Sequence, residues 1–299
     1  MSIARIVPST WHHRTAAEAA ELYCSAIPRT TEVSRSHYPT EGLPDFQEPF
    51  AGDVLTIELD LDGLGLTLIN AGDDFTPNTS ISFMVNFDPS REPDARELLD
   101  QTWAALVDGG NELIPLGQTK FSDRYGWVTD RFGVGWQLIL TDPDGDQRPL
   151  VIPTFLFAGP ARGRAADAMA SWIELFEDSS PGVLASQPLD TSTAKAGEVM
   201  FADFRLAGQW FAAMDAPEGS GDAFSPGVSI QAMCETQDDI DRLWATLSTV
   251  PDAEQCGWCV DEFGVSWQIV PEGMDRMLLE RPESYAAMMQ MKRIVIDDL

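Results

Sequence analysis

The sequence contains little positive charge. Its 299 residues include 19 lysines and arginines against 48 aspartates and glutamates, and only three of these cations are lysines. The formal net charge of −29 at pH 7 creates a field that repels phosphate backbones and anionic membrane surfaces. The composition therefore argues against nucleic acid and membranes as partners. It leaves open whether the acidity reflects a halophilic or a GC-rich host.

Long apolar runs and disulfide frameworks are absent as well. No stretch of about 18 unbroken apolar residues occurs, which argues against a membrane span. The N-terminal "MSIARIVPSTWHHR" has no basic region followed by a long apolar region, so we expect no signal peptide and a cytoplasmic location. Four cysteines are too few for a disulfide framework in a chain of this size, and the Cys-x-x-Cys pair at 256–259 has no second pair to complete a zinc site.

One distinctive phrase occurs twice. Residues 130–139 read "DRFGVGWQLI" and residues 261–270 read "DEFGVSWQIV". The preceding segments also match, since "RELLDQTWAALVDGG" resembles "DDIDRLWATLSTV" and the early run "IVPSTWH" resembles "VIPTFLF". The chain is therefore a tandem duplication with a unit of about 140 residues.

Local signals follow the same order in each copy. In the first copy, an extended apolar run at 3–12 precedes an alanine-rich helix whose expected N-cap is Thr15. Two alternating strands joined at Asp62-Gly63 follow as a hairpin, and a later helix has Asp88 as its expected N-cap. Strands and helices in this order indicate an α+β fold and not the strict alternation of a Rossmann sheet.

The duplication and its polar connection divide the chain. The segment "TDPDGDQRP" is rich in proline, glycine and acidic residues, as expected for a linker between copies. A methionine-rich amphipathic segment follows the second copy. We therefore assign a first module at 1–141, a linker at 142–149, a second module at 150–273, and a C-terminal helix and tail at 274–299.

The repeated Asp-x-Phe-Gly-Val-x-Trp-Gln closely resembles the PhnB-like proteins, as do "DDIDRLWATL" before its second copy and "MMQMKRIVIDDL" after it. These proteins also carry the domain label 3-demethylubiquinone-9 3-methyltransferase. They belong to the vicinal oxygen chelate superfamily, with glyoxalase I, bleomycin-resistance proteins and dioxygenases. The resemblance implies four βαβββ units, paired so that each module folds its sheets around a concave pocket. It also implies an intrachain pseudo-dimer in place of a homodimer, with further dimerisation left open.

The same resemblance places the superfamily's metal-binding slots. Its metalloenzymes hold a divalent cation with His and Glu side chains on the first and last strands of each unit. Proline offers no donor atom, and the neutral oxygens of serine and glutamine are weak ligands for a divalent ion. We therefore expect no metal and no other cofactor. By this resemblance the slots hold Pro8, Pro153, Ser82, Ser229, Gln137 and Gln268.

The methyltransferase label finds no support in the residues. An S-adenosylmethionine site of the usual type needs a glycine-rich turn between a strand and a helix, followed by an acidic residue after the next strand. The glycine cluster "FAGPARGRAADAM" at 157–169 lacks that spacing and contains a proline.

The last strand of each copy offers pocket candidates. In an extended 133–140, Gly135 and Gln137 share one face and Trp136 lies on the other. The glutamines either face a pocket or satisfy buried backbone groups, and the tryptophans of the preceding strands either wall a pocket or fill the core. The candidates are Gln137, Gln268, Ser82, Ser229, Trp127, Trp258, Gly135, Ser266 and His12.

Three functions remain open at this point. The favoured prediction is a protein that binds a small molecule of unknown identity in a metal-free pocket. The alternative is an enzyme of the superfamily, of the metal-dependent lyase or dioxygenase type, with ubiquinone methyltransferase activity disfavoured. The third is that one copy has lost its pocket and only supports the other, because the second copy lacks much of the segment equivalent to 33–50.

Overall fold

The computed structural model describes residues 3–281 and 283–299, and it contains four units that each begin with a strand and a helix. Three of them continue with three strands, whereas the fourth continues with two in the described part of the chain. The first copy consists of β1 (Ile3–His13), α1 (Ala16–Ala26), β2 (Thr30–His37), β3 (Val54–Leu61), β4 (Leu64–Ala71), β5 (Ile81–Phe87), α2 (Ala95–Val107), β6 (Asn111–Gly117), β7 (Tyr125–Thr129) and β8 (Gly135–Leu140).

The second copy repeats this order and ends in an additional segment. Short 3-10 turns occur at Glu48–Phe50, Gly159–Ala161, Pro251–Ala253 and Ile296–Asp298. The larger elements are β9 (Val151–Phe157), α3 (Ala165–Leu175), β10 (Ser180–Ser186), β11 (Val199–Leu206), β12 (Gln209–Asp215), β13 (Val228–Cys234), α4 (Gln237–Leu247), β14 (Trp258–Val260), β15 (Ser266–Pro271), α5 (Met274–Glu280) and α6 (Ser284–Met288).

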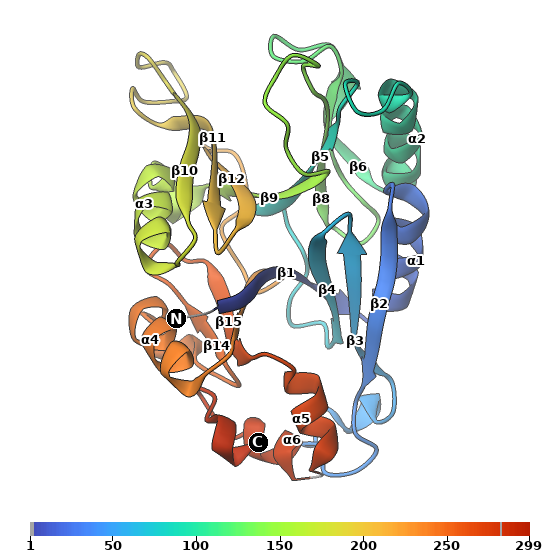
Figure 1. The fold of residues 1–299 in the computed structure, drawn as a ribbon, viewed down its shortest axis with the longest axis vertical. Helices are drawn as coiled ribbons and strands as arrows, with labels where there is room; N and C mark the ends of the chain where they lie inside the picture. Colours follow the sequence, from blue (N-terminus) through green and yellow to red (C-terminus); the bar gives the residue numbers. More distant parts are fainter. Residues whose placement is uncertain (1–2, 282) are drawn as a thin grey trace.

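The strands form two mixed sheets, and each sheet combines strands of both copies (Figure 1). Sheet A has the order β14-β15-β13-β1-β4-β3-β2, and sheet B has the order β10-β11-β12-β9-β5-β8-β7-β6. The copies join through two antiparallel pairs, β1 with β13 and β5 with β9. The four predicted units are therefore present. The expectation that each module folds its own pair of sheets is wrong, because the first strand of each unit finds its partner in the other copy.

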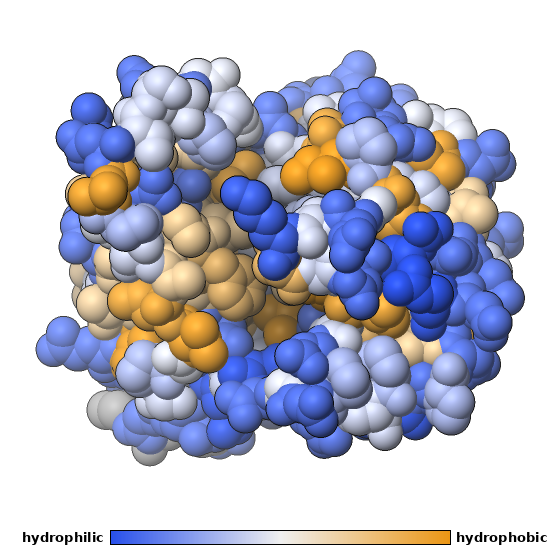
Figure 2. Space-filling view, turned by 90° about the horizontal axis from the view of Figure 1, so that it is seen from above, coloured by the Kyte–Doolittle hydropathy of each residue, from blue (hydrophilic) through white to orange (hydrophobic). Residues whose placement is uncertain are grey.

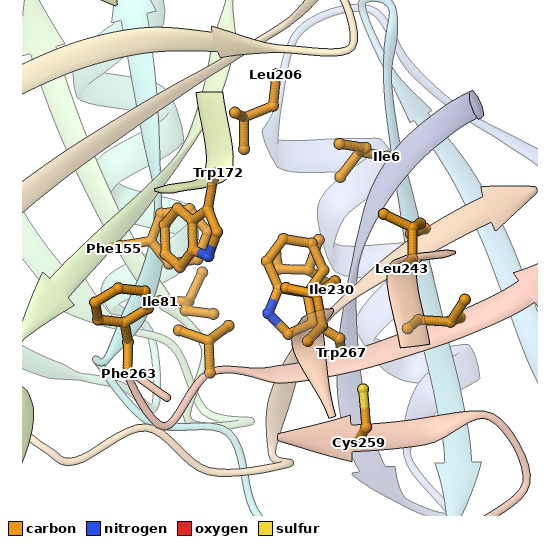
Figure 3. Packing of buried hydrophobic residues seen from close by; sticks show 14 of the residues in the cluster. Ile6, Ile81, Phe155, Trp172, Leu206, Ile230, Leu243, Cys259, Phe263 and Trp267 are labelled. Carbon is orange, nitrogen blue, oxygen red and sulfur yellow. The ribbon is translucent and has the colours of Figure 1, made fainter. Parts of the chain in front are cut away.

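Two large hydrophobic cores nevertheless lie beneath the helices, and each consists mainly of residues of one copy. In the first copy, α1 and α2 pack against the inner faces of both sheets and bury Tyr23, Leu99 and Trp136. In the second copy, Trp172 of α3 and Trp267 of β15 lie in the corresponding core (Figure 3). Each sheet therefore has one face on the helices and an opposite concave face, and successive residues of a strand alternate between them.

Several local predictions hold, and others need correction. The hairpin turns at Asp62 and Gly63, both with positive φ, as two-residue hairpin turns require. The second helix begins at Ala95, later than predicted, because Asp88 accepts a hydrogen bond from the Ser90 amide in a separate turn. The C-terminal segment forms two short helices in place of one. Among the described residues, no helix is both long and apolar enough to cross a membrane.

Candidate ligand-binding grooves on the concave faces

The repeated phrase forms a turn organised by a buried aspartate. Asp130 Oδ1 accepts hydrogen bonds from the backbone amides of Phe132 and Val134, at 2.8 and 3.1 Å. Its Oδ2 accepts from Trp136 Nε1 at 2.9 Å and from the Tyr23 hydroxyl of α1 at 2.7 Å. One carboxylate thus fixes the turn before β8, the indole below that strand and the first helix.

The second copy repeats this arrangement around Asp261. Its Oδ1 accepts from the amides of Phe263 and Val265, and its Oδ2 accepts from the indoles of Trp267 and Trp172. Burial raises the pKa of both aspartates, and the hydrogen bonds that they accept oppose this shift. The phrase is therefore a scaffold. Our sequence reasoning missed these two aspartates, although an aspartate six residues before a tryptophan in both copies was a usable signal.

Strand register identifies the residues on the two concave faces. Ser82 pairs with Thr154 in sheet B, and Ser229 pairs with Ser9 in sheet A, so the members of each pair share a face. Pro8 and Pro153, assigned to the first-strand slots from sequence, pair with the core residues Ile230 and Phe83. That assignment is wrong by one residue, and a shift of one residue in a strand places the side chain on the opposite face.

On sheet B, three candidate residues form one polar chain on the concave face. The Tyr125 hydroxyl donates to Gln137 Oε1 at 2.7 Å, and Gln137 Nε2 donates to Ser82 Oγ at 2.9 Å. Gln137 and Ser82 are both fully buried. The glutamine thus satisfies neighbouring side chains, and its amide is already used before any ligand binds.

Sheet A carries the counterpart chain. Gln268 Nε2 donates to Ser229 Oγ at 2.9 Å, and Gln231 Nε2 donates to Gln268 Oε1 at 3.3 Å. Gln268 and Ser229 therefore repeat the relationship of Gln137 and Ser82. The sequence correctly predicted that these residues share the face opposite the buried tryptophans Trp136 and Trp267.

We call the side chains of the central strands on each concave face the floor of that face. The remaining candidates on the two floors differ between the sheets. A Cβ atom at Gly135 would lie 3.0 Å from the Ser82 Cβ and 3.5 Å from Trp127 Nε1, so the missing side chain lets the indole lie close to the floor. Trp127 is half-buried, and its Nε1 has no hydrogen-bond partner among the described residues. In sheet A, Trp258 instead contacts Trp11, with ring centroids 6.1 Å apart, and Ser266 takes a position on the floor.

His12 does not reach either concave face. It pairs with Asn70 on the side of sheet A that carries α1, its Nε2 lies 2.9 Å from Thr10 Oγ1, and its ring packs edge-on against Phe132. The side chain is buried, and burial lowers its pKa to about 4. A neutral imidazole packed among core residues is a structural group and not a rim feature.

The floors offer poor ligands for a divalent metal. The positions nearest the strand junctions hold Ser, Thr and Gln oxygens, which carry no charge to offset that of the ion. No cluster of three or more His, Cys, Asp or Glu side chains suited to a metal occurs in residues 3–281 and 283–299. The residues present do not fit the His and Glu site of the superfamily's metalloenzymes.

The two concave faces also differ in what covers them. Met274 of α5 packs on Val7, Met233 and Val270, which lie on the concave face of sheet A. Sheet B is hollowed between two lobes when seen from above, and apolar residues line the hollow (Figure 2). Two further hollows of about 260 and 270 Å³ lie beside α1 and α2 and beside Arg29 and Arg148, and none of the candidate residues lines them.

Comparison with known proteins shows which family and which solved structures this chain resembles. A sequence model of the family described as 3-demethylubiquinone-9 3-methyltransferase matches residues 4–139 and 149–270. No curated protein matches the chain. Among solved structures, a PhnB protein from Bacillus cereus is 27% identical over 45% of this chain and 98% of its own, with a TM-score of 0.38.

Glyoxalase I from Zea mays matches over 95% of this chain and 97% of its own, at 11% identity and a TM-score of 0.51, which is a likeness of fold alone. The two family matches correspond to the two copies that build sheets A and B. The chain therefore belongs to the PhnB-like family described as 3-demethylubiquinone-9 3-methyltransferase, with the fold of the vicinal oxygen chelate superfamily.

Proposed function

We propose that the chain binds a neutral, apolar or aromatic small molecule in the groove over sheet B, without the help of a metal ion. The observation that carries this proposal is Trp127, whose indole lies against the floor with an unpaired, buried Nε1. A buried donor without a partner costs free energy unless a ligand or water accepts from it. A ligand with a hydrogen-bond acceptor above Gly135 would remove that cost.

The surroundings of Trp127 define the ligand chemistry. Its ring packs against a buried cluster of the second copy formed by Leu156, Ala158 and Ala216, so both copies contribute to the site. Trp210 presents a second half-buried indole on the same sheet, with the Arg148 guanidinium 4.3 Å from its ring centroid. A mostly apolar groove with few polar groups is typical of small-molecule sites, and the net charge of −29 disfavours anionic ligands.

The alternative is a metal-dependent enzyme of the superfamily. Ser82, Thr154 and Gln137 lie at the strand junction of sheet B where such a site would need charged or imidazole ligands. The proposal therefore assigns this face to binding, and the polar chain of Tyr125, Gln137 and Ser82 to holding its shape.

Binding of Nile red, a neutral dye that fluoresces in apolar surroundings, tests the proposal. We expect saturable binding to the wild-type protein and an affinity at least about tenfold lower for Trp127→Leu, since hydrophobic and aromatic contacts of about 1.5 kcal/mol or more are lost. Trp244→Leu is the matched control, because Trp244 is another half-buried tryptophan but packs on the second core. Its binding should match that of the wild type.

Two results would overturn the proposal. One is the absence of saturable binding to the folded wild-type protein. The other is a stoichiometric divalent metal that copurifies with the protein and is required for binding, which would favour the enzyme.

We further propose a cytoplasmic location and no nucleic-acid partner. The four cysteines are all free thiols, as is usual in reducing compartments, and the acidity repels polyanions. Cell fractionation tests the location, and recovery of the protein outside the cytoplasmic fraction would contradict it.

A further inference from the structure

We propose that α5 and α6, which we call the C-terminal lid, close a second ligand site on the concave face of sheet A. The pseudo-dimer would then have one open groove and one closed groove. This inference rests on the proposed function for its ligand chemistry, but the lid and the floor beneath it stand on separate contacts.

The lid crosses the concave face from one copy to the other. At its start, Met274 contacts Val7 of β1, Met233 of β13 and Val270 of β15. These three side chains share the face of Ser9, Ser229 and Gln268, because they lie an even number of residues away on the same strands. The first turn of α5 therefore lies directly on the floor.

The far end of the lid is anchored in the first copy. The Tyr285 hydroxyl of α6 donates to Gln47 Oε1 at 2.8 Å, within the connection between β2 and β3. Figure 1 shows α5 and α6 side by side at the end of the molecule, between β15 and that connection. The lid thus spans the mouth of the groove and not only its edge.

The floor under the lid has unused hydrogen-bonding groups. Ser9 is fully buried and Ser266 is 2% exposed, yet neither Oγ has a partner within the described residues. Ser9 pairs with Ser229 across the junction, so three hydroxyls lie on adjacent strands β1, β13 and β15. In sheet B the counterpart of Ser9 is Thr154, whose hydroxyl bonds to the Ile152 carbonyl, and the counterpart of Ser266 is Gly135.

Aromatic rings cover these hydroxyls. Trp11 is on β1 and Trp258 is on β14, and two strands separate them in sheet A. Their ring centroids are nevertheless only 6.1 Å apart, so the indoles must lean towards each other over β13 and β15. Phe75 extends the cluster, with its centroid 5.2 Å from that of Trp11. Rings in edge-to-face contact above free hydroxyls suit an aromatic ligand that carries a hydroxyl or amide group.

The lid also contains a feature that favours opening. Burial, and after it repulsion from the Glu58 carboxylate of β3, raises the pKa of Asp275 in α5. Arg5 offsets this only weakly, since its guanidinium lies 3.6 Å from Glu58 and is itself half exposed. A closed lid with an unfavourable charge contact is more easily displaced than one held by apolar packing alone.

The stoichiometry of Nile red binding to the full chain tests the inference. Met274→Glu places a charge on Val7, Met233 and Val270 and should open the lid, raising the number of bound dye molecules from one to two. Val33→Glu adds the same charge at a position that is 62% exposed on β2 and should leave one molecule bound. Trp258→Leu introduced into the Met274→Glu protein should remove the second molecule and keep the first.

Failure of the inference is distinguishable from failure of the proposed function. One dye molecule bound to a folded Met274→Glu protein would overturn the lid site and leave the sheet B site intact. No saturable binding to the wild type would overturn the sheet B site. If Met274→Glu does not fold, Tyr285→Phe, which loses only the bond to Gln47, should still increase the dye's access to the second site, and unchanged binding to that variant would overturn the inference.

Discussion

At the scale of single residues, the aspartates of the repeated phrase account for its recurrence. Asp130 satisfies two backbone amides, an indole and a phenol, and Asp261 satisfies two amides and two indoles. A carboxylate is the one side chain of this size with enough acceptor capacity for four donors. The phrase therefore marks the family because it forms the turn, and not because it carries chemistry.

Asp130→Ala should lower the free energy of unfolding by roughly 3–5 kcal/mol, because four donors lose their acceptor and most of them are buried. Urea unfolding followed by tryptophan fluorescence measures this loss. Asp88→Ala serves as the control, since among the described residues the Asp88 carboxylate accepts from the exposed Ser90 amide alone, and the substitution should cost at most about 1 kcal/mol. A loss at Asp130 no larger than that of the control would contradict the structural role.

His12 makes stability depend on pH. Its pKa falls from 6.5 to about 4 on folding, so between these values the folded protein binds fewer protons than the unfolded chain, and stability falls as the pH drops. The full effect is roughly 3 kcal/mol. Unfolding measured from pH 7 to pH 4.5 should show a smaller loss for His12→Gln than for the wild type. The exposed His13→Gln should behave like the wild type, and equal slopes in all three proteins would refute the assignment.

At the scale of elements, the glycine in the turn before the last strand has less free space around it in the first copy than in the second. Gly133 has φ +86° and Gly264 has φ +91°, a region that costs a residue with a side chain about 1–2 kcal/mol. A Cβ at Gly133 would also lie 3.1 Å from the Pro77 carbonyl oxygen, whereas one at Gly264 would meet nothing closer than Phe224 at 4.0 Å. Gly133→Ala should therefore lower the melting temperature more than Gly264→Ala. Equal shifts in melting temperature would show that the positive φ alone sets the cost of the substitution, and that the neighbouring Pro77 carbonyl adds nothing.

The sequence predicted elements with strong local signals and missed those without. The turn at Asp62-Gly63 and the mostly apolar run of β5, which is buried throughout, were readable from the residues alone. The edge strands β2, β6 and β10 are mostly exposed, so they lack the alternation that identifies a strand. The lid could not be predicted either, because the contacts that hold it on the first copy, Tyr285 with Gln47 and Met274 with Val7, join residues more than 200 positions apart.

The faces on which the candidate site residues lie were predictable in part for the same reason. Alternation placed Gln137 and Gln268 correctly, since the buried tryptophans next to them fix the face. The family resemblance put the first-strand slot on Pro8, whereas Ser9 is the residue on the concave face, and periodicity gives no warning of an error of one residue. His12 falls on the helix-facing side by the same alternation.

At the scale of the whole molecule, pairing between copies makes the two halves depend on each other. Separating the chain within the linker 142–149 exposes β1 and β5 in one half and β9 and β13 in the other. Each half alone should form a homodimer or aggregate, because unpaired strand edges seek partners. Mixing the halves should restore a one-to-one complex. Size-exclusion chromatography with light scattering checks this, and a stable monomeric half would contradict it.

The division of each concave face between copies also affects how such a chain can change over generations. In a symmetric homodimer, every substitution is made twice and alters both clefts together. Here Trp127 belongs to sheet B alone and Trp258 to sheet A alone, so a mutation at either position alters a single cleft. Fusion of the two copies would thus release one cleft from the constraints on the other, and the unequal pair that we propose, one open and one covered, is an outcome that such freedom permits.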